Sequence, residues 1–359
     1  MTPLAQIIRG DIHAAGPLPV SRFMALALAH PRHGYYTTRD PFGCDFTTAP
    51  EISQMFGELI GAWAADTWLR LGAPASVTLA ELGPGRGTLM ADAVRAARTQ
   101  PGFAQAAQIC LVEISPTLTA VQRQRVAPAA QAAGFAAPIW VSDIGHLPDG
   151  PLIVLANEFF DALPIRQFVK TDRGWCERCV AEAAGALAFM AAPTPLADTT
   201  CLPPTAHDAQ EGAILEVSPA RDSTVLHLGE RLAAASGAAL IVDYGYTQSR
   251  PGDTLQALHN GAPTPVLHAP GDSDITAHVD FEALARAVPA GCTVHGPIPQ
   301  GQFLARLGLE QRAAALSRSA PQHAPAIAAA AHRLTADDAM GTLFKVMAIT
   351  GSNVQPAGF

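Results

Sequence analysis

Short apolar segments and helical segments alternate through the middle of the chain. Residues 77–82 form an apolar run typical of a buried strand, and a glycine-rich turn leads from it into a helical pattern over 88–98. The same order continues further along, with strands expected at 109–112, 138–141 and 152–156 and a helix that begins at Pro116. Alternation of this kind indicates βαβ units. We therefore expect an α/β fold with a doubly wound, mostly parallel sheet that is covered on both faces.

The first 75 residues carry turn signals and then one helix. Loops are expected at residues 30–34 and 40–43, which contain both proline and glycine. Between residues 51 and 71 the apolar positions follow helical spacing, and a glycine and a proline just beyond end the helix. This part is interpreted as an N-terminal helical and lid segment.

The second half of the chain adds antiparallel and loop-rich segments. Antiparallel additions are expected within residues 165–190, and a Pro/Thr-rich linker or exposed loop is expected over 191–210. Further expected elements are a strand at 214–217, a helix with Ser218 as N-cap and Pro219 at its first position, a buried strand at 239–243, a loop-rich segment over 246–278 and a last strand at 343–349. The last strand is expected at the antiparallel edge of the sheet.

Composition and charge narrow the function classes. The chain has 359 residues, of which 49% are hydrophobic and 15% are charged, so it can bury a sizeable core. Its formal net charge of −8 argues against a protein that binds the phosphate backbone of nucleic acids. No apolar run approaches the length of about 18 residues that a membrane span requires. The first residues have no features of a secretion or transit signal, so we expect a cytoplasmic protein.

The most informative stretch is the turn that follows the strand at 77–82. Three glycines, Gly83, Gly85 and Gly87, alternate there before a helix begins. Glycine permits positive φ and a close approach of the backbone to a ligand, and open α/β sheets bind ligands at the carboxyl ends of their strands. A nicotinamide dinucleotide site requires the spacing G-x-G-x-x-G, whereas the spacing here is G-x-G-x-G.

Acidic residues end three of the expected strands. Glu81 precedes the glycine turn and suits a ligand with a cationic amino acid end, and Glu113 is placed to accept both hydroxyls of a ribose. Asp143 ends the third strand. Together they predict a pocket for S-adenosyl-L-methionine. Ser115 and Asn157, which follow two of the strands, complete the set of candidate cofactor-binding residues.

Several long motifs resemble the MidA family of methyltransferases. They lie at residues 34–36, 45–58, 81–89, 157–164, 216–219, 243–245, 252–256 and 276–281. The resemblance extends over nearly the whole chain. It implies a class I methyltransferase fold with S-adenosyl-L-methionine as the cofactor. Mitochondrial relatives in that family symmetrically dimethylate an arginine of a respiratory complex I subunit during assembly.

The chain is expected to divide into three parts. Residues 1–75 would form the N-terminal helical and lid segment, and 76–245 the cofactor-binding core with an insertion near 165–212. Residues 246–359 would supply acceptor-side loops, helices and the last strand of the core sheet. The family usually has a glycine-rich stretch before its Thr-Ala-Pro-Glu run, whereas this chain is shorter there and has Cys44 in place of a glycine.

An arginine acceptor explains the candidate catalytic residues. A guanidinium is always charged in water, so carboxylates must hold and orient it. Glu158, just after the fourth strand, is the expected clamp, and Asp161 is a second candidate. His278 resembles the histidine of a Thr-His loop that lines the acceptor pocket of other arginine methyltransferases. Glu51, Tyr36 and Phe46 are the candidate substrate and lid residues.

Other functions remain open at this point. The leading hypothesis is a protein methyltransferase that acts on an arginine of a partner protein, without nucleic acid or membrane partners. The alternatives are methylation of a small molecule on the same fold, or an assembly factor that binds the cofactor without turnover. The pair Cys176 and Cys179 has no second cysteine or histidine pair at zinc spacing, so no metal is expected.

Overall fold

The computed structural model describes residues 2–38, 48–351 and 354–359, which form two compact units. The N-terminal unit comprises Met1–Phe46, Asp161–Thr224 and Thr247–Leu284, and the sheet unit comprises Thr47–Phe160, Val225–Tyr246 and Ala285–Phe359. The sequence-based division at residues 75/76 and 245/246 differs from this one. The reason is that the helix at 54–70 packs on the central sheet, whereas residues 161–224 and 247–284 fold with the N-terminal helices.

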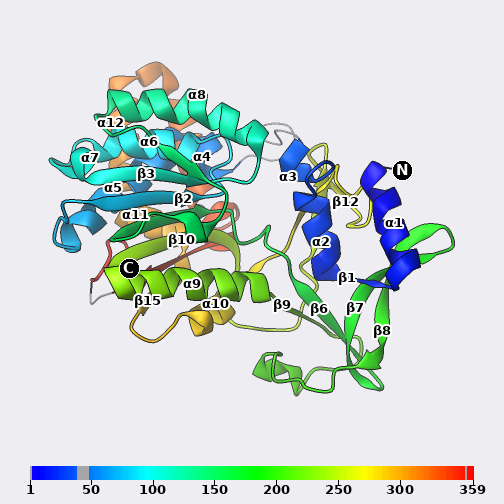
Figure 1. The fold of residues 1–359 in the computed structure, drawn as a ribbon. Helices are drawn as coiled ribbons and strands as arrows, with labels where there is room; N and C mark the ends of the chain where they lie inside the picture. The colour runs from blue at the N-terminus through cyan, green and yellow to red at the C-terminus, as the bar shows by residue number, and fades with distance from the viewer. Residues whose placement is uncertain (1, 39–47, 352–353) are drawn as a thin grey trace. The chain divides into compact units, whose positions relative to one another are not determined.

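The sheet unit is built around strands in the order β15-β16-β10-β5-β2-β3-β4 (Figure 1). The five strands from β10 to β4 are parallel, and β16 is antiparallel to both of its neighbours. Their bounds are β2 Val77–Leu82, β3 Ala107–Val112, β4 Ile139–Val141, β5 Leu152–Asn157, β10 Gly237–Tyr246, β15 Thr293–Pro299 and β16 Phe344–Thr350. All six residues of β2 are buried, so both faces of the sheet are covered there.

The predicted parallel sheet is confirmed, but one expectation about its edge is wrong. β16 was expected at the edge, yet it lies between β10 and β15. β15 was not predicted as a strand because two of its seven residues are prolines, which disfavour strand interiors. Proline is tolerated at a sheet edge, which is the position that β15 occupies.

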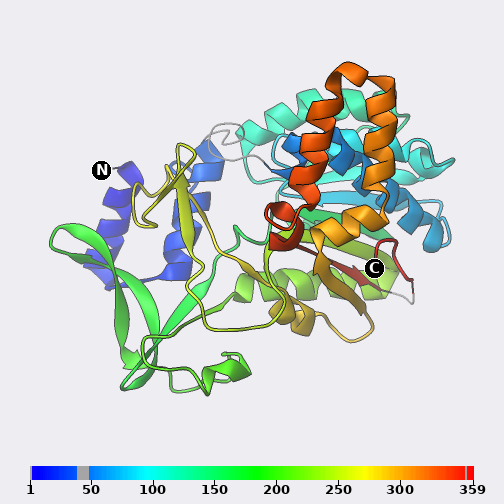
Figure 2. The ribbon, with the colours of Figure 1, turned by 180° about the vertical axis from the view of Figure 1, so that it is seen from behind.

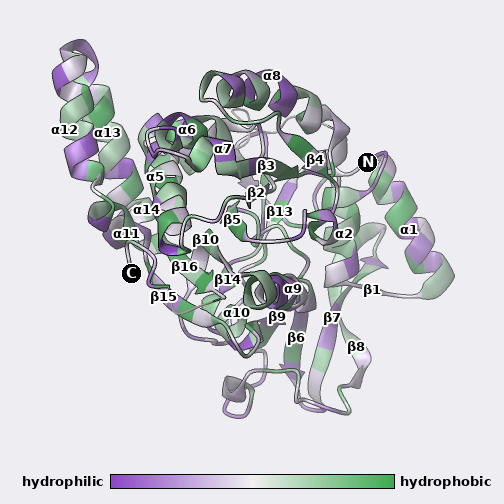
Figure 3. Ribbon diagram, turned by 60° about the vertical axis from the view of Figure 1, so that its left-hand side comes forward, coloured by the Kyte–Doolittle hydropathy of each residue, from purple (hydrophilic) through white to green (hydrophobic). Residues whose placement is uncertain are grey.

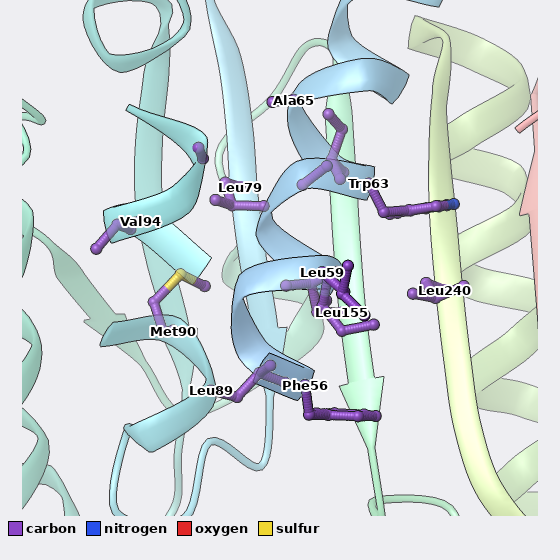
Figure 4. Packing of buried hydrophobic residues seen from close by; sticks show 14 of the residues in the cluster. Phe56, Leu59, Trp63, Ala65, Leu79, Leu89, Met90, Val94, Leu155 and Leu240 are labelled. Atoms are coloured by element: carbon purple, nitrogen blue, oxygen red, sulfur yellow. The ribbon is translucent and has the colours of Figure 1, made fainter. Parts of the chain in front are cut away.

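Helices cover the sheet and share its largest hydrophobic core. The helical bounds are α4 Ala49–Ile52, α5 Gln54–Arg70, α6 Thr88–Ala97, α7 Phe103–Ala106, α8 Pro116–Ala132, η1 Ile144–His146, α11 Gln300–Arg306, α12 Leu309–Ser319, η3 Pro321–His323, α13 Ala324–Thr335 and α14 Met340–Leu343. In Figure 4, Leu59 and Trp63 of α5 face the side of the sheet that carries Leu155 and Leu240. The predicted helices at 51–71, 88–98 and from Pro116 are confirmed as α5, α6 and α8.

Two glycines let α5 and α6 approach each other closely. A Cβ atom at Gly61 would lie 2.2 Å from the carbonyl oxygen of Ala93, and one at Gly57 would lie 2.5 Å from Cβ of Asp92. No real Cβ atom tolerates such distances, so one of the two helices would have to move. Because α6 begins directly after the glycine turn, this crossing also fixes where that turn sits.

We expect Gly61→Ala to destabilise the protein by about 1–3 kcal/mol, the usual cost of overpacking a rigid core. Gly10, inside a helix of the N-terminal unit, has nothing within 4 Å of a built Cβ atom, so Gly10→Ala is the matched control. It should be neutral or stabilising by about 0.5–1 kcal/mol. Urea unfolding of both variants measures the difference. If Gly61→Ala were as stable as the wild type, α5 and α6 would be able to move apart without a loss of stability, which would contradict this prediction.

Helices α12 and α13 form a hairpin next to α11 (Figure 2). Both carry hydrophilic and hydrophobic residues (Figure 3), and Leu309 and Leu334 anchor them in the core of the sheet unit. A bidentate ion pair between Arg312 and Glu58, with distances of 2.7 and 2.8 Å, ties α12 to α5. Within the described residues, no helix is long and apolar enough to cross a membrane.

The N-terminal unit combines helices with antiparallel strands. Its first sheet has the order β1-β7-β6-β9, with β8 paired to β7, and its second has the order β12-β11-β13. The bounds are α1 Pro3–Ala15, β1 Leu18–Pro19, α2 Val20–Ala29, α3 Tyr35–Thr38, β6 Arg166–Thr171, β7 Gly174–Ala183, β8 Ala186–Pro195, η2 Pro204–Ala206, β9 Ile214–Val217, β11 Gln256–His259, β12 Ala262–Thr264, β13 Asp274–Thr276 and β14 Val279–Asp280. Helices α9 (Pro219–Ala235) and α10 (Phe281–Ala287) cross the unit boundaries in sequence.

The antiparallel additions expected at 165–190 are confirmed as β6, β7 and β8, and the strand expected at 214–217 is confirmed as β9. The linker or loop expected from residue 191 is wrong at its start, because β8 continues to Pro195. The expectation of a single helix in the first 75 residues is wrong, because α1 and α2 precede it. Their signals were present: Thr2 caps α1 by accepting a hydrogen bond from the N–H of Ala5, and Leu4, Ile8 and Ile12 recur at helical spacing and are buried.

Candidate functional site

The glycine turn has the backbone geometry that its sequence predicts. Gly83, Gly85 and Gly87 have φ values of +59°, +53° and +76°, in the left-handed region that other residues rarely adopt. A Cβ atom at Gly87 would lie 2.5 Å from a methyl group of Val126, and one at Gly83 would lie 2.9 Å from the ring of Phe159. The turn thus leaves bare backbone at the end of β2, where the sheet order changes direction between β3 and β5.

Glu81 places a buried carboxyl group beside this turn. The residue is 3% exposed, and its Oε2 has no hydrogen-bond partner among the described residues. Burial raises the pKa of Glu81 well above its usual range, and the nearby charge of Glu113 raises it further, while the backbone N–H of Met90 opposes both. A buried oxygen without a donor is costly, so a cationic group of a ligand would stabilise it.

Glu113, at the end of β3, is held by its own loop and by α8. Its Oε1 accepts a hydrogen bond of 2.7 Å from the N–H of Ser115, and its Oε2 accepts one of 2.9 Å from Gln122. Burial raises the pKa of Glu113, and these two donors together with the N–H of Ile114 lower it again in part. The hydroxyl of Ser115 caps α8 through the N–H of Leu118, at 3.3 Å.

The structure brings the predicted cofactor residues to one edge of the sheet. Leu82 of β2 lies in register with Val112 of β3 and Ala156 of β5, and Val112 lies in register with Val141 of β4. The side chains at the ends of these four strands therefore share that edge. Asp143 is exposed there, and its Oδ1 caps the short helix η1 through the N–H of Gly145, at 2.7 Å. Asn157 ends β5, and its buried Oδ1 has no partner among the described residues.

Glu158 has a strained backbone. Its φ of +50° lies in the left-handed region, which is rare for a residue with a side chain. The strain is held by a hydrogen bond of 2.9 Å from its N–H to the carbonyl oxygen of Val242. Its Oε1 accepts hydrogen bonds of 3.1 Å from the N–H of Ala49 and from the amide of Asn157. Strain maintained in this way is frequent at functional sites.

Asp243, which the sequence-based candidate list did not include, fixes the turn that carries Glu158. It lies on β10, the strand next to β5, and is fully buried. Its Oδ2 accepts a hydrogen bond of 3.0 Å from the N–H of Phe160, and its Oδ1 accepts one of 2.9 Å from the N–H of Tyr244. The sequence did carry a signal for Asp243, because it is the acidic residue that ends the otherwise apolar run 239–243.

Glu51 lies on α4 and links that helix to the beginning of α6. Its carboxylate accepts hydrogen bonds from the hydroxyl of Thr88 and, at 3.4 Å, from Arg125 of α8. Arg125 also donates to Thr88. Glu51 therefore stabilises the first turn of α6, and its predicted role toward a substrate stays a prediction. Phe46, like the segment around Cys44, lies outside the described residues.

The other three candidates belong to the N-terminal unit. The hydroxyl of Tyr36 donates a hydrogen bond of 2.8 Å to Asp274. Burial raises the pKa of Tyr36 well above its usual range, and the charges of Asp274 and Asp161 raise it further. Asp161 is buried, whereas His278 is half-buried and its backbone N–H donates to the hydroxyl of Thr254 at 3.0 Å.

Arg221, which sequence reasoning missed, connects Asp161 to His278. Its guanidinium donates to the backbone carbonyl oxygens of Asp161, Ala277 and His278 at 3.2, 2.8 and 2.7 Å. The arginine is only 4% exposed, so these bonds offset much of the cost of its burial. The position three residues after Ser218, in the first turn of α9, was its sequence signal.

Cys176 and Cys179 both lie on β7 and are buried. Across residues 2–38, 48–351 and 354–359, no group of three or more His, Cys, Asp or Glu side chains is arranged to hold a metal ion.

Known proteins resemble this chain over most of its length. Residues 59–298 match the family model of S-adenosyl-L-methionine-dependent methyltransferases. A mouse (Mus musculus) relative, "Protein arginine methyltransferase NDUFAF7, mitochondrial", is 35% identical over 87% of this chain and 76% of its own length. Its Drosophila melanogaster homologue is 34% identical over 96% of this chain and 84% of its own.

A solved structure is similar to the whole chain. The crystal structure of a Burkholderia thailandensis protein bound to S-adenosyl-homocysteine has a TM-score of 0.83 and 32% identity, and the match covers 99% of this chain and 93% of that one. The expectation of a cytoplasmic location is contradicted by the animal relatives, whose names describe mitochondrial proteins. That expectation is therefore corrected.

Proposed function

The chain belongs to the family of S-adenosyl-L-methionine-dependent methyltransferases, and from this premise we propose that it methylates an arginine side chain of a partner protein. The fold is that of the class I methyltransferases, and the cofactor is S-adenosyl-L-methionine, as the sequence predicted. The arginine acceptor is proposed because two relatives at 34–35% identity are named protein arginine methyltransferases.

The residues at the edge of the sheet fit this cofactor. The glycine turn leaves room for a ligand to approach the backbone, and the buried Oε2 of Glu81 and Oδ1 of Asn157 lack hydrogen-bond partners among the described residues. We propose that these oxygens face the amino acid end of the cofactor and that Glu113 accepts the ribose hydroxyls. Asp143 and Ser115 are proposed to complete the pocket. When bound, the cofactor supplies a methyl group on a positively charged sulfur.

The observation that carries the acceptor proposal is the carboxylate of Glu158 on a strained backbone. It follows β5, which pairs directly with β2, the strand that leads into the glycine turn. A guanidinium carries its charge at every physiological pH, so a negative side chain is needed to hold it and to orient one nitrogen. Transfer would break the bond between the sulfur and the methyl carbon and form a nitrogen–carbon bond, and the acceptor nitrogen would then lose one proton. We propose Glu158 as the clamp.

The remaining candidates are proposed as acceptor-side residues. Asp161 adds a second carboxylate, and His278 and Tyr36 are proposed to contact the substrate. Glu51 and Phe46 are proposed to contribute from the lid segment.

Labelling of a lysate tests the arginine proposal. Extract proteins are incubated with the purified enzyme and S-adenosyl-L-methionine that carries a radioactive methyl group, then hydrolysed and separated as amino acids. We expect label in methylated arginine and its loss with a Glu158→Gln enzyme. Label that appears only in small molecules would favour the small-molecule alternative. Cofactor binding without any label would favour an assembly factor, and either result would overturn the proposal.

A further inference from the structure

A fully buried glutamine connects three parts of the cofactor edge. Gln122 lies on α8 and has 0% exposure, although its side chain is polar. Its Nε2 donates to the carbonyl oxygen of Gly85 at 2.7 Å and to Oε2 of Glu113 at 2.9 Å. Its Oε1 accepts a hydrogen bond of 2.9 Å from the indole of Trp140. Gly85 follows β2, Glu113 follows β3, and Trp140 lies in β4.

The chemistry of the partners fixes the orientation of the amide. An indole N–H only donates, so the oxygen of Gln122 must face Trp140. The NH2 group then faces two acceptors, the carbonyl oxygen of Gly85 and the carboxylate of Glu113, and each takes one of its two hydrogens. A flipped amide would leave three mismatched contacts in a buried site, which is costly. Gln122 therefore has a single satisfied arrangement.

This arrangement restrains the two groups that face the cofactor in the proposed function. The carboxylate of Glu113 is held on one oxygen by the N–H of Ser115 and on the other by Gln122. The same amide holds the carbonyl of Gly85, in the middle of the glycine turn. We infer that Gln122 is a positioning residue for cofactor binding, which sets the spacing between the ribose acid and the glycine turn. The inference rests on the proposed assignment of Glu113 and Gly85 to the cofactor site.

Calorimetry with S-adenosyl-homocysteine separates positioning from a purely structural role. Gln122→Met keeps the length of the side chain and removes all three hydrogen bonds. We expect at least about a tenfold loss of affinity, the scale of one hydrogen bond to a charged group. Gln124, an exposed glutamine on the same helix, gives the matched control Gln124→Met, which should bind as the wild type does. An affinity of folded Gln122→Met equal to that of the wild type would overturn the inference.

The pH dependence of binding supplies a readout that packing alone would not move. Protonation of Glu113 removes an acceptor, so affinity should fall as the pH falls through the pKa of this residue. The hydrogen bond from Gln122 lowers that pKa. In Gln122→Met the decline should therefore begin at a higher pH than in the wild type. The pKa of the buried Glu81 is raised by the charge of Glu113. A Glu113 that is protonated at a higher pH would therefore lower the pKa of Glu81, so Glu81 would not produce this shift.

Two further variants keep the outcome unambiguous. Glu113→Ala tests the proposed site itself: wild-type affinity in this variant would refute the ribose assignment. Weak binding by Glu113→Ala together with normal binding by Gln122→Met would refute only the inference about Gln122. If Gln122→Met does not fold, Trp140→Phe replaces it, since loss of the indole donor releases the amide. We expect about a threefold loss of affinity or more there, and no loss would overturn the inference.

Discussion

Glu158→Gln is expected to lower methyl transfer to protein at least about 100-fold, the scale of losing one electrostatic group in a transition state. S-adenosyl-homocysteine affinity should stay near that of the wild type, because the proposed cofactor contacts lie on other residues. Glutamine keeps an oxygen at the position that accepts from Ala49 and Asn157, so those hydrogen bonds persist. Both side chains carry the same cost at φ +50°, so stability should also be unchanged.

Single-turnover labelling and calorimetry measure the two quantities separately. Asp149, an exposed acid just before β5, gives the control Asp149→Asn, which removes the same charge and should leave turnover unchanged. Asp161→Asn is expected to cost less than Glu158→Gln. Wild-type turnover in Glu158→Gln would show that another acid holds the acceptor.

Gly85→Val is expected to abolish measurable cofactor binding, which corresponds to a loss of at least about 100-fold in affinity. Gly85 has φ +53°, a conformation that costs a β-branched residue about 1–2 kcal/mol before any contact is considered. The valine side chain would also extend from backbone that the cofactor must approach. The carbonyl oxygen of Gly85 is held by Gln122, so the turn has little freedom to adjust.

Gly72→Val is the control that separates the loss of stability caused by the backbone conformation from the loss of cofactor affinity. Gly72 has φ +89° in the same unit, with nothing within 4 Å of a built Cβ atom. Both variants should lose stability in thermal unfolding, and only Gly85→Val should lose affinity for S-adenosyl-homocysteine. Normal affinity in folded Gly85→Val would remove the turn from the cofactor site.

The central sheet was predictable because its strands are buried on both faces. A strand such as β2 or β5 must then be apolar throughout, and a short apolar run between turn residues is visible in sequence. β15 was not visible, since its prolines are compatible with a strand only at an edge, and the sequence does not mark the edge. The helices α1 and α2 were missed although their apolar spacing was regular, because nearby turn signals dominated the interpretation.

The candidate site was likewise only partly predictable from the sequence. Glu81, Glu113 and Asn157 were identifiable because they occupy the ends of recognisable strands, and the structure places them along one sheet edge. Gln122, which holds Glu113, and Asp243, which holds the N–H of Phe160, were not identifiable, because the role of each depends on which distant group it meets after folding. Arg221 was hidden for the same reason, since the carbonyl oxygens of Asp161, Ala277 and His278 that accept from it are backbone groups that any sequence supplies.

The place of β16 in the sheet has a consequence for synthesis on the ribosome. β16 lies between β10 and β15, yet about 100 residues separate the end of β10 from its start. At a rate of about 5–20 residues per second, translation of that interval takes roughly 5–20 s. Throughout it, the edge of β10 that β16 covers over residues 238–244 lacks its native partner, and unpaired edges invite pairing with other chains. The strand edge that is open to aggregation in the nascent protein thus belongs to β10, an interior strand of the finished sheet. The speed of translation sets how long this edge stays exposed.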